Sequence, residues 1–346
     1  MTANNRNDIL ISDEVVDLNK YTLGFDIGGT KCAVILGKAE ITDNNADDII
    51  IDKIKFDTLQ PRGWKAIVEE LFVSAEELLE RNSITASQVI GWGISCGGPL
   101  DSKKGVIMCP PNLPDWDNVP LVELTEKRLG IKTKLQNDAN ACALAEWRFG
   151  AGKGTNNMIF LTFGTGMGAG LILDGKLYSG TNDMAGEVGH IRLEKDGPAG
   201  YGKKGSFEGF CSGGGIANLA KQIVLKKFTQ GIIPSFCKDE SELNNVTAKS
   251  VAEAAFAGDK TALEIYDVCG EYLGRGLSLL IDILNPEAII IGSIYQRSSA
   301  LLQVKMQAVI NDEALNQAAA VCKILPAVLG DSIGDYAALG VAFMNE

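Results

Sequence analysis

The sequence predicts an α/β protein built as two similar halves around a cleft, and three observations support this. The chain has 346 residues, which is more than one compact core usually holds. Segments with the composition of strands alternate with segments of helical period along most of its length. A strand, a glycine turn and a second strand occur once in each half, over residues 22–36 and 159–174. We therefore expect two sheets, each covered by helices.

In the first half, a short strand is expected at 9–11, ahead of the strand that begins at residue 23. That strand is broken by a tight turn at 26–31 and resumes over 32–36. The other elements follow from composition and periodicity. They are strands at 49–56, 89–95 and 132–135, helices at 64–81 and 121–129, and a Pro-rich loop at 109–120.

In the second half, the strand, turn and strand pattern restarts over 158–173. A polar, Gly-rich region follows at 180–215, and the chain beyond it is largely helical, with Thr247 as a helix cap. The remaining elements alternate. They are a helix at 262–284 stopped by Asn285-Pro286, a strand at 288–291, a helix at 298–311, a strand at 323–327 and a helix at 335–343.

Composition excludes several classes of protein. The formal net charge is −12, whereas non-specific nucleic-acid binding requires a basic surface. The eight cysteines contain no CxxC pair, so they are interpreted as free thiols in a reducing compartment. The first 20 residues lack the basic start and apolar core of a signal peptide, and no run of about 18 apolar residues suggests a membrane span. A cytoplasmic protein that contacts neither membrane nor nucleic acid is expected.

A further helix is expected to begin at Asn137-Asp138, where a polar segment gives way to an Ala-rich stretch. Asn and Asp are preferred N-caps, so Asp138 is expected at or beside a helix N-terminus. The helix dipole there favours its ionised form, which can accept a proton. Taken alone, such an acid is usually no more than a cap.

Two glycine-rich turns could bring backbone N–H groups close to an anion. The first, at 26–31, has Asp26 at its mouth and Lys31 at its end, and an ordinary hairpin explains it equally well. The second, at 164–170, has glycine at every second position. Ala169 stands where a dinucleotide fingerprint needs glycine, and no Gly-Lys-Ser/Thr follows, so neither a Rossmann nor a Walker loop is predicted. Four alternating glycines are costly for a simple bend, which favours a phosphate cradle.

His190, the one histidine in the chain, follows Glu187 by three positions in a polar loop. A lone histidine is more often structural than functional. Its place soon after the second glycine turn makes hydrogen bonding to a polar ligand an equally good interpretation. Glu208, further along the same Gly-rich region, would on its own be a solvated surface acid.

Together these segments resemble the ROK family (repressor, open reading frame, kinase) of the actin-like ATPase and sugar-kinase superfamily. The resemblance runs from about Tyr21 to the C-terminus. It rests on two phosphate motifs at 26–31 and 163–170, a catalytic segment at 137–141, a sugar signature at 187–190 and a segment near the adenosine at 289–293. It implies two ribonuclease-H-like lobes around a central cleft, and a homodimer formed through the large lobe. The small lobe would comprise residues 1–136 plus 333–346, and the large lobe 137–332.

By the same resemblance, Asp138 would be the general base that takes a proton from a hexose hydroxyl, usually on C6. The hydroxyl oxygen would attack the γ-phosphate of MgATP, with Mg²⁺ near Asp26. Besides Asp138, the residues that match the family's sugar contacts are Gly98, Asn112, Asn137, Glu187, His190 and Glu208. Those that match its ATP and phosphate contacts are Asp26, Gly28, Gly29, Thr30, Lys31, Gly164, Thr165, Gly166 and Gly292.

The chain departs from the family after His190. Many members carry three cysteines there that, with the histidine, bind a structural Zn²⁺; here Ala199, Tyr201 and Ser206 replace them. Those side chains cannot complete a tetrahedral zinc site, so no zinc is predicted and the 199–206 loop must hold His190 instead. Repressor members carry an N-terminal helix-turn-helix, for which the 20 residues before Tyr21 are too few.

The sequence therefore predicts an ATP-dependent sugar kinase, with glucose as the expected substrate because the loop around Asn112 looks like that of the family's glucokinases. N-acetylmannosamine, N-acetylglucosamine and fructose are alternative substrates. The alternative of another class is a non-catalytic sugar-binding regulator on the same scaffold. Asp26, Asp138 and both glycine turns argue against it, because a sensor needs no phosphate cradle.

Overall fold

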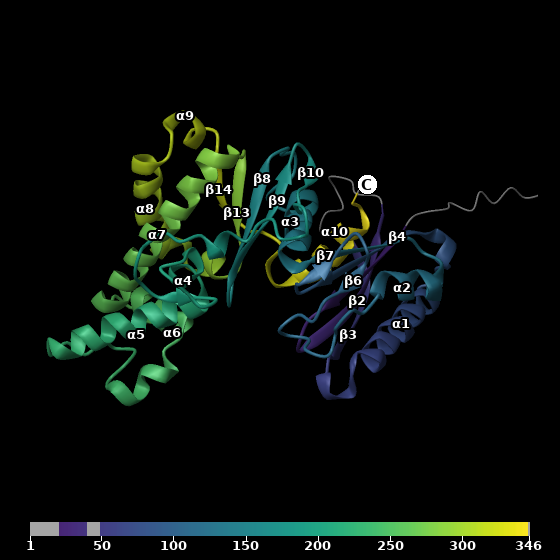
Figure 1. The fold of residues 1–346 in the computed structure, drawn as a ribbon, viewed down its shortest axis with the longest axis horizontal. Helices are drawn as coiled ribbons and strands as arrows, with labels where there is room; N and C mark the ends of the chain where they lie inside the picture. The colour runs from purple at the N-terminus through teal and green to yellow at the C-terminus, as the bar shows by residue number, and fades with distance from the viewer. Residues whose placement is uncertain (1–20, 40–48, 345–346) are drawn as a thin grey trace, which may run out of the picture.

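The computed structural model describes residues 21–39 and 49–344 and confirms the α/β class: two five-stranded sheets stand next to each other, each with helices packed on it (Figure 1). The strand predicted at 9–11 lies outside the described residues. None of the described helices combines the length and the apolar composition that a bilayer span needs.

The first sheet has the strand order β3-β2-β1-β4-β7. Its strands are β1 (Tyr21–Ile27), β2 (Lys31–Lys38), β3 (Ile50–Asp57), β4 (Val89–Cys96) and β7 (Thr133–Asn137). The first three form an antiparallel meander, whereas β4 and β7 run parallel to β1. The helices α1 (Trp64–Arg81) and α2 (Leu121–Leu129) cover one face, over a fully buried core that includes Leu23, Phe25 and Trp92.

The other face of this sheet packs against α10 (Ile333–Ala342), which comes from the end of the chain. Two glycines let the helix lie this close. A Cβ on Gly93 would stand 2.0 Å from the carbonyl oxygen of Ala338, and one on Gly24 would stand 2.7 Å from the Ala338 Cβ. Glycines in strand interiors often mark such a close approach of backbone, and here they fix a contact between the two ends of the sequence.

The second sheet has the order β10-β9-β8-β13-β14. Its strands are β8 (Met158–Phe163), β9 (Met167–Leu173), β10 (Lys176–Leu177), β13 (Ala288–Ile291) and β14 (Lys323–Pro326). Strands β8 and β9 are antiparallel, and β13 and β14 run parallel to β8. The helices that accompany this sheet are α4 (Phe207–Phe210), α5 (Gly213–Thr229), α6 (Ala248–Phe256), α7 (Lys260–Leu284), α8 (Ile294–Glu313) and α9 (Asn316–Ala319).

A layer of two helices lies between the sheets (Figure 1). Leu144 of α3 (Asp138–Phe149) and Leu339 of α10 are buried in a core that also takes Ile35 from β2, Phe160 from β8 and Ile290 from β13. The side chains that alternate with these along β8 and β13 enter a separate core with α5 to α8. Both sheets therefore pack on the same helical layer.

Short elements connect the main ones. They are the hairpins β5 (Leu100–Asp101) to β6 (Val106–Ile107) and β11 (Ala199–Gly200) to β12 (Lys203–Lys204), and the 3-10 turns η2 (Gln60–Arg62), η3 (Ala86–Gln88), η4 (Val188–His190), η5 (Glu240–Asn245) and η6 (Gly330–Ser332). Thr247 caps α6 as predicted, accepting the N–H of Ser250 at 3.1 Å. The helix predicted at 298–311 instead begins at Ile294, because it continues through a kink at Ser298 that breaks its periodicity.

Candidate active site

Three strand ends meet at one edge of the first sheet. The parallel register pairs Ile27 of β1 with Cys96 of β4, and Cys96 with Asn137 of β7. The segments that follow are the first glycine turn, the bend at Gly98 and the start of α3 at Asp138. A Cβ on Gly98 would lie 4.0 Å from the Cβ of Asn137. Ligands of open α/β sheets bind at the carboxyl ends of parallel strands, so this edge is the candidate active site.

Asp138 is the first residue of α3, directly after β7. The cap itself is Asn137, whose Oδ1 accepts the N–H of Asn140 at 2.8 Å, while Asp138 Oδ1 accepts the N–H of Ala139 at 2.8 Å. Desolvation by the surrounding protein raises the pKa of the Asp138 carboxyl, and its bond to Ala139 opposes this rise. The side chain is nevertheless exposed to water. We interpret this combination as a carboxylate that protein surrounds on most sides but leaves open on one.

The loop of Asn112 lies against the first glycine turn. A Cβ on Gly29 would be 2.5 Å from the carbonyl oxygen of Asn112. Gln60 Nε2 donates to the carbonyl oxygens of both residues, at 2.7 Å for Gly29 and 2.6 Å for Asn112. The structure thus places Asn112 beside the first glycine turn. Gln60 was not predicted, because a glutamine in a polar connection carries no distinguishing signal in the sequence.

The predicted sugar signature forms the turn η4, with Glu187 immediately before it and His190 at its end. Both side chains are exposed. Partial burial raises the pKa of Glu187; the carboxylates of Asp138 and Glu208 add to the rise, and His190 opposes it. These four residues therefore lie within electrostatic reach of one another, although they come from separate segments.

Glu208 is partly buried in α4 and bonded to the second glycine turn. Its Oε2 accepts the N–H of Met167 at 2.9 Å, and a Cβ on Gly166 would stand 2.8 Å from the same oxygen. A predicted sugar contact is therefore fixed to the backbone of a predicted phosphate turn. The bond explains why this acid is not simply solvated, which its sequence context alone would suggest.

The loop with Ala199, Tyr201 and Ser206 contacts the His190 turn without a metal ligand set. Lys203 Nζ donates to the carbonyl oxygen of His190 at 2.6 Å, and the rings of Tyr201 and His190 meet edge to face with centroids 6.3 Å apart. Ser206 caps α4 by accepting a backbone N–H at 3.1 Å. Across residues 21–39 and 49–344, no three His, Cys, Asp or Glu side chains are grouped as a metal site would require.

The first glycine turn is a tight hairpin between β1 and β2. The N–H of Gly28 donates to the carbonyl oxygen of Lys31 at 3.0 Å, and Thr58 Oγ1 donates to the carbonyl oxygen of Gly28 at 2.7 Å. Thr30 and Lys31 are exposed at its tip. The hairpin and the phosphate interpretations are therefore compatible, since the turn leaves a hydroxyl and an ammonium group accessible.

Asp26 lies at the mouth of this turn, against the first turn of α10. Its Oδ2 is 2.5 Å from the position that a Cβ on Gly334 would occupy. Burial raises the pKa of Asp26 to about 6; the charges of Asp335 and Asp138 add to the rise, and Lys55 opposes it. The site therefore concentrates negative charge around one carboxylate.

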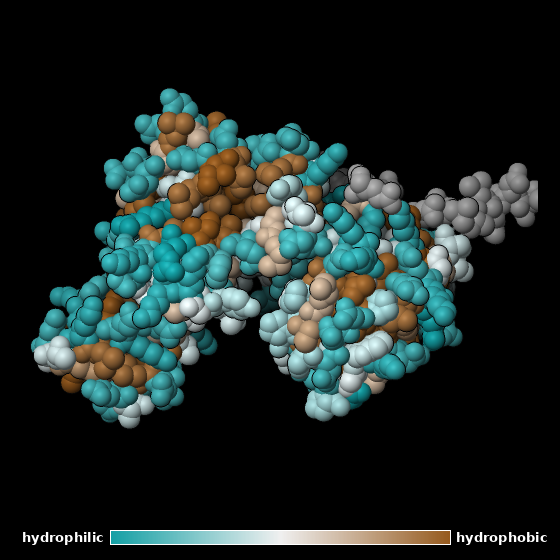
Figure 2. Space-filling view, viewed as in Figure 1, coloured by the Kyte–Doolittle hydropathy of each residue, from teal (hydrophilic) through white to brown (hydrophobic). Residues whose placement is uncertain are grey.

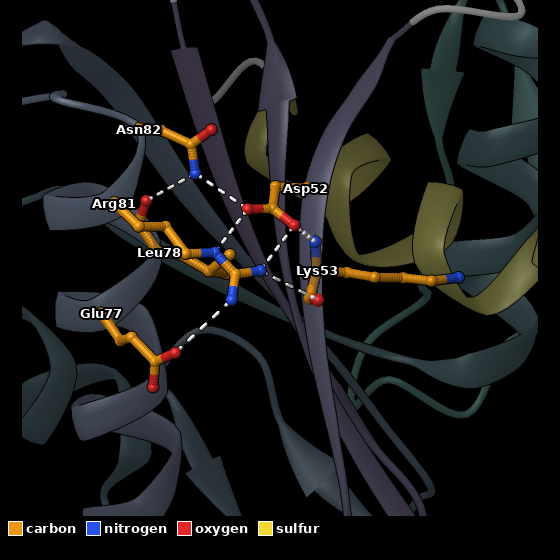
Figure 3. Close-up of polar contacts among 6 residues, drawn as sticks. All are labelled: Asp52, Lys53, Glu77, Leu78, Arg81 and Asn82. Atoms are coloured by element: carbon orange, nitrogen blue, oxygen red, sulfur yellow. Dashed lines mark hydrogen bonds and ion pairs between the residues drawn. The ribbon is translucent and has the colours of Figure 1, made fainter.

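Edge strand β3 carries the cations that balance this charge. Lys53 Nζ donates to buried Asp335 at 2.7 Å, and Lys55 Nζ lies 3.7 Å from its other oxygen. The Lys53 side chain extends towards α10 (Figure 3). Its neighbour Asp52 points to the opposite side of the strand, where Arg81 of α1 donates two hydrogen bonds of 2.6 Å to the carboxylate. This ion-pair cluster was not predicted, because alternating charges on an edge strand are usually a solvated face.

The second glycine turn meets two other segments. The carbonyl oxygen of Gly164 accepts the N–H of Gly213, the first residue of α5, at 2.7 Å. Gly292, which follows β13, bonds to β8 beside the turn. Gly292 also lines a cavity of about 240 Å³ together with Thr162 and Arg297. The predicted adenosine and phosphate segments are thus contiguous in space.

Comparison with known proteins identifies the family. The family model for ROK matches residues 22–344. The chain belongs to the ROK family. It is 34% identical to the glucokinase of Thermotoga maritima over 81% of this chain and 84% of that enzyme.

Two further ROK relatives show what the family contains. A glucokinase from Streptomyces griseus, solved in complex with glucose and AMPPNP, is 29% identical, with a TM-score of 0.68 over 93% of this chain and 99% of that one. The xylose repressor of Caldicellulosiruptor bescii is 31% identical over 70% of this chain and 60% of its own length. The predicted fold class of two actin-like α/β lobes is confirmed by the structural match, while both sugar kinases and regulators occur among the relatives.

Proposed function

We propose that this ROK protein is an ATP-dependent hexose kinase with Asp138 as the general base. The observation that carries the proposal is the position of Asp138 between two sets of groups. Asp138 follows β7 at the sheet edge where β1 and β4 also end, and its charge adds to the effect of burial in raising the pKa of Asp26 on the phosphate side and of Glu187 on the sugar side. A base must reach the acceptor hydroxyl beside the donor phosphate, and this position supports that role for Asp138. The similarity to glucokinases supports the same reaction.

In the proposed reaction, a sugar hydroxyl donates a hydrogen bond to Asp138. Its oxygen attacks the γ-phosphorus as the proton passes to the carboxylate, and ADP leaves. The bond from Ala139 N–H holds the carboxylate in place, so little reorganisation is needed. The raised pKa makes Asp138 a stronger base than a solvated aspartate. The backbones of the two glycine turns would donate to the phosphate oxygens, and Glu208 fixes the end of the second turn through Met167.

Asp26 is the residue we propose to hold the Mg²⁺ that accompanies ATP. Burial raises its pKa first, and the charges of Asp335 and Asp138 add to the rise, so a divalent cation bound here would favour the ionised carboxylate. When bound, Mg²⁺ neutralises charge on the β- and γ-phosphates. We propose no zinc, because Lys203 and Tyr201 contact the His190 turn where the family's zinc loop would otherwise hold it.

We propose glucose, phosphorylated at C6, as the acceptor. The glucose complex of the Streptomyces griseus relative supports this choice. The proposed contacts offer hydrogen-bonding groups that suit the hydroxyls of an uncharged sugar; they are Gly98, Asn112, Asn137, Glu187, His190 and Glu208. N-acetylmannosamine, N-acetylglucosamine and fructose are the alternative acceptors, because their hydroxyls offer similar hydrogen bonds.

We also propose that the chain folds as two lobes and forms a homodimer through the larger one. We propose a small lobe of residues 1–136 plus 333–346 and a large lobe of 137–332. The packing of α10 on β1 and β4 supports assigning the end of the chain to the small lobe. In this division α3 begins the large lobe, and the layer that it forms with α10 would be the site of relative motion.

The second candidate function is a sugar-binding regulator without catalysis, which the similarity to a xylose repressor favours. One assay separates the two functions. ADP release should be measured with MgATP against glucose, mannose, fructose, N-acetylglucosamine and N-acetylmannosamine. We expect glucose to stimulate release most strongly. If no sugar stimulates release while glucose still binds by calorimetry, the kinase proposal fails and the regulator is favoured.

A further inference from the structure

One pair of residues joins the loops on either side of the proposed sugar site. Ser102 lies at the tip of the β5–β6 hairpin of the first sheet's half, and Asp183 lies between β10 and η4 in the second. Asp183 Oδ2 accepts the N–H of Ser102 at 2.8 Å, and its Oδ1 accepts the Ser102 hydroxyl at 2.7 Å. The two residues are 81 positions apart, so both bonds cross between the halves.

The hairpin is tied to the proposed sugar contacts on its own side. It begins two residues after Gly98 and ends five residues before Asn112. Met108 N–H donates to the carbonyl oxygen of Pro99 at 3.0 Å, which closes the base of the hairpin. Ile107 is fully buried in the core of that half. Ser102 is therefore attached, through this hairpin, to the segments that contain Gly98 and Asn112.

The loop of Asp183 is tied in the same way on the other side. Its start is fixed by Ala185 N–H, which donates to the carbonyl oxygen of Ser179 at 3.1 Å. Its end is fixed by Ala169 of β9, whose N–H donates to the carbonyl oxygen of Gly186 at 2.8 Å. The next residue is Glu187, a proposed sugar contact. Asp183 therefore lies in a loop that is anchored to its own half and leads directly into the η4 turn.

The backbone of Asp183 indicates why a carboxylate matters there. Its φ is 61°, in the left-handed region that glycine adopts most easily and other residues rarely do. A residue held in this region is expected where its side chain makes a compensating contact. The two bonds to Ser102 are such a contact. Among the residues the structure describes, no lysine or arginine pairs with Asp183, so the attachment is to Ser102 and not to a mobile surface cation.

We propose that the Ser102–Asp183 pair is a positioning contact that holds the sugar-binding segments of the two halves at the separation the sugar requires. The inference rests on the proposed kinase function. Neither residue is proposed to touch the reacting atoms, so the pair acts on sugar binding and not on phosphoryl transfer. Without it, the two walls of the site separate more often, and the sugar's apparent affinity falls with the population of the closed arrangement.

The test variant is Asp183→Gly, because glycine suits a φ of 61° and removes the carboxylate without straining the fold. The matched control is Asp174→Gly, since Asp174 also has a positive φ, 51°, in the β9–β10 turn, and its side chain bonds to none of the described residues of the other half. Urea unfolding of each variant first shows that it is folded under the conditions of the binding assay. Glucose binding is then measured by calorimetry, and kcat and KM by ADP release.

We expect Asp183→Gly to raise both Kd and KM for glucose about tenfold, as loss of hydrogen bonds to a partly exposed charged group should. Its kcat and its KM for MgATP should stay within about twofold of wild type, and Asp174→Gly should match wild type throughout. Ser102→Ala should have a smaller effect and add nothing to Asp183→Gly, because both act on one contact.

Two outcomes would overturn the inference, and they are distinguishable. If wild-type protein binds and phosphorylates glucose and Asp183→Gly does so with unchanged Kd, the positioning role is wrong while the kinase function stands. The same holds if the two substitutions act additively. If wild-type protein neither binds nor phosphorylates any hexose of the panel, the proposed function fails and takes this inference with it.

Discussion

Replacing Asp26 with asparagine should stabilise the free protein while removing its activity. The pKa of Asp26 rises from an ordinary 3.8 to about 6, chiefly by burial and next by the charges of Asp335 and Asp138. The folded state therefore disfavours the ionised form. Asparagine has nearly the same shape, cannot ionise, and so should not carry this energetic cost.

The magnitude follows from linkage. A tenfold change in proton affinity is worth about 1.4 kcal/mol, so ionised Asp26 costs the folded state roughly 3 kcal/mol at pH 8. A raised acid pKa gives stability that is complete below 3.8 and is lost as pH rises through about 6. The excess stability of Asp26→Asn should therefore grow from roughly 0.5 kcal/mol at pH 4 to about 3 kcal/mol at pH 8. This figure already includes the opposing charge of Lys55, which lowers the pKa of Asp26.

Urea unfolding of both proteins at pH 4, 6 and 8, without nucleotide or Mg²⁺, measures this difference directly. ADP release should fall by at least about a hundredfold in the variant, because the proposed metal-holding carboxylate is gone. A variant less stable than wild type at pH 8, or a difference that does not change with pH, would show that Asp26 is held by favourable contacts and would refute the electrostatic argument.

Three further predictions concern the surroundings of the site. Asp52→Asn should lower the free energy of unfolding by ~1 kcal/mol at pH 7, because Arg81 lowers the pKa of Asp52 to about 2 while solvent screening weakens the pair. The loss should fade as pH falls through 3.8 towards 2, and a loss that stays constant in urea unfolding across this range would contradict the prediction. Gly29→Ala should lower kcat/KM at least about tenfold, because its Cβ would stand 2.5 Å from the Asn112 carbonyl oxygen; unchanged kinetics would show that the turn can relax. Protein purified without chelator should contain no stoichiometric zinc by elemental analysis, and one zinc per chain would refute the account of the His190 turn.

The parts of the fold that sequence could predict are those with local chemical signals. Glycine turns between apolar strands, an Asn-Asp pair before an Ala-rich helix and the Asn-Pro stop after α7 each mark an element where it occurs. The observed register aligns Ile27, Cys96 and Asn137, and so brings the first glycine turn, Gly98 and Asp138 to one edge of the first sheet.

The remaining features depend on contacts between distant segments. In the sequence, Gly24 and Gly93 only suggest positions that destabilise a strand, whereas in the structure they allow the backbone of α10 to pack closely on the sheet. Gln60 and Asp183 are ordinary polar loop residues whose partners are set only by the fold. Such pairs cannot be predicted from one sequence, because nothing in the local sequence around either residue indicates its partner.

The helical layer of α3 and α10 positions Asp138 relative to both sheets. Asp138 belongs to α3, which packs on both sheets, whereas Asp26 lies in the first sheet and Glu187 precedes the turn η4 of the second half. The proposed base is therefore anchored in the helical layer on which both sheets pack.

The central claim is that Asp138 takes the proton from the sugar. The most direct test is Asp138→Asn, which keeps the size of the side chain and removes its basicity. We expect kcat to fall by about 10²–10⁴ while the calorimetric Kd for glucose changes by less than about threefold, because the base acts in the transition state and binding is shared with its neighbours. Turnover close to that of the wild type would contradict the account and leave Asp138 as the first residue of a helix.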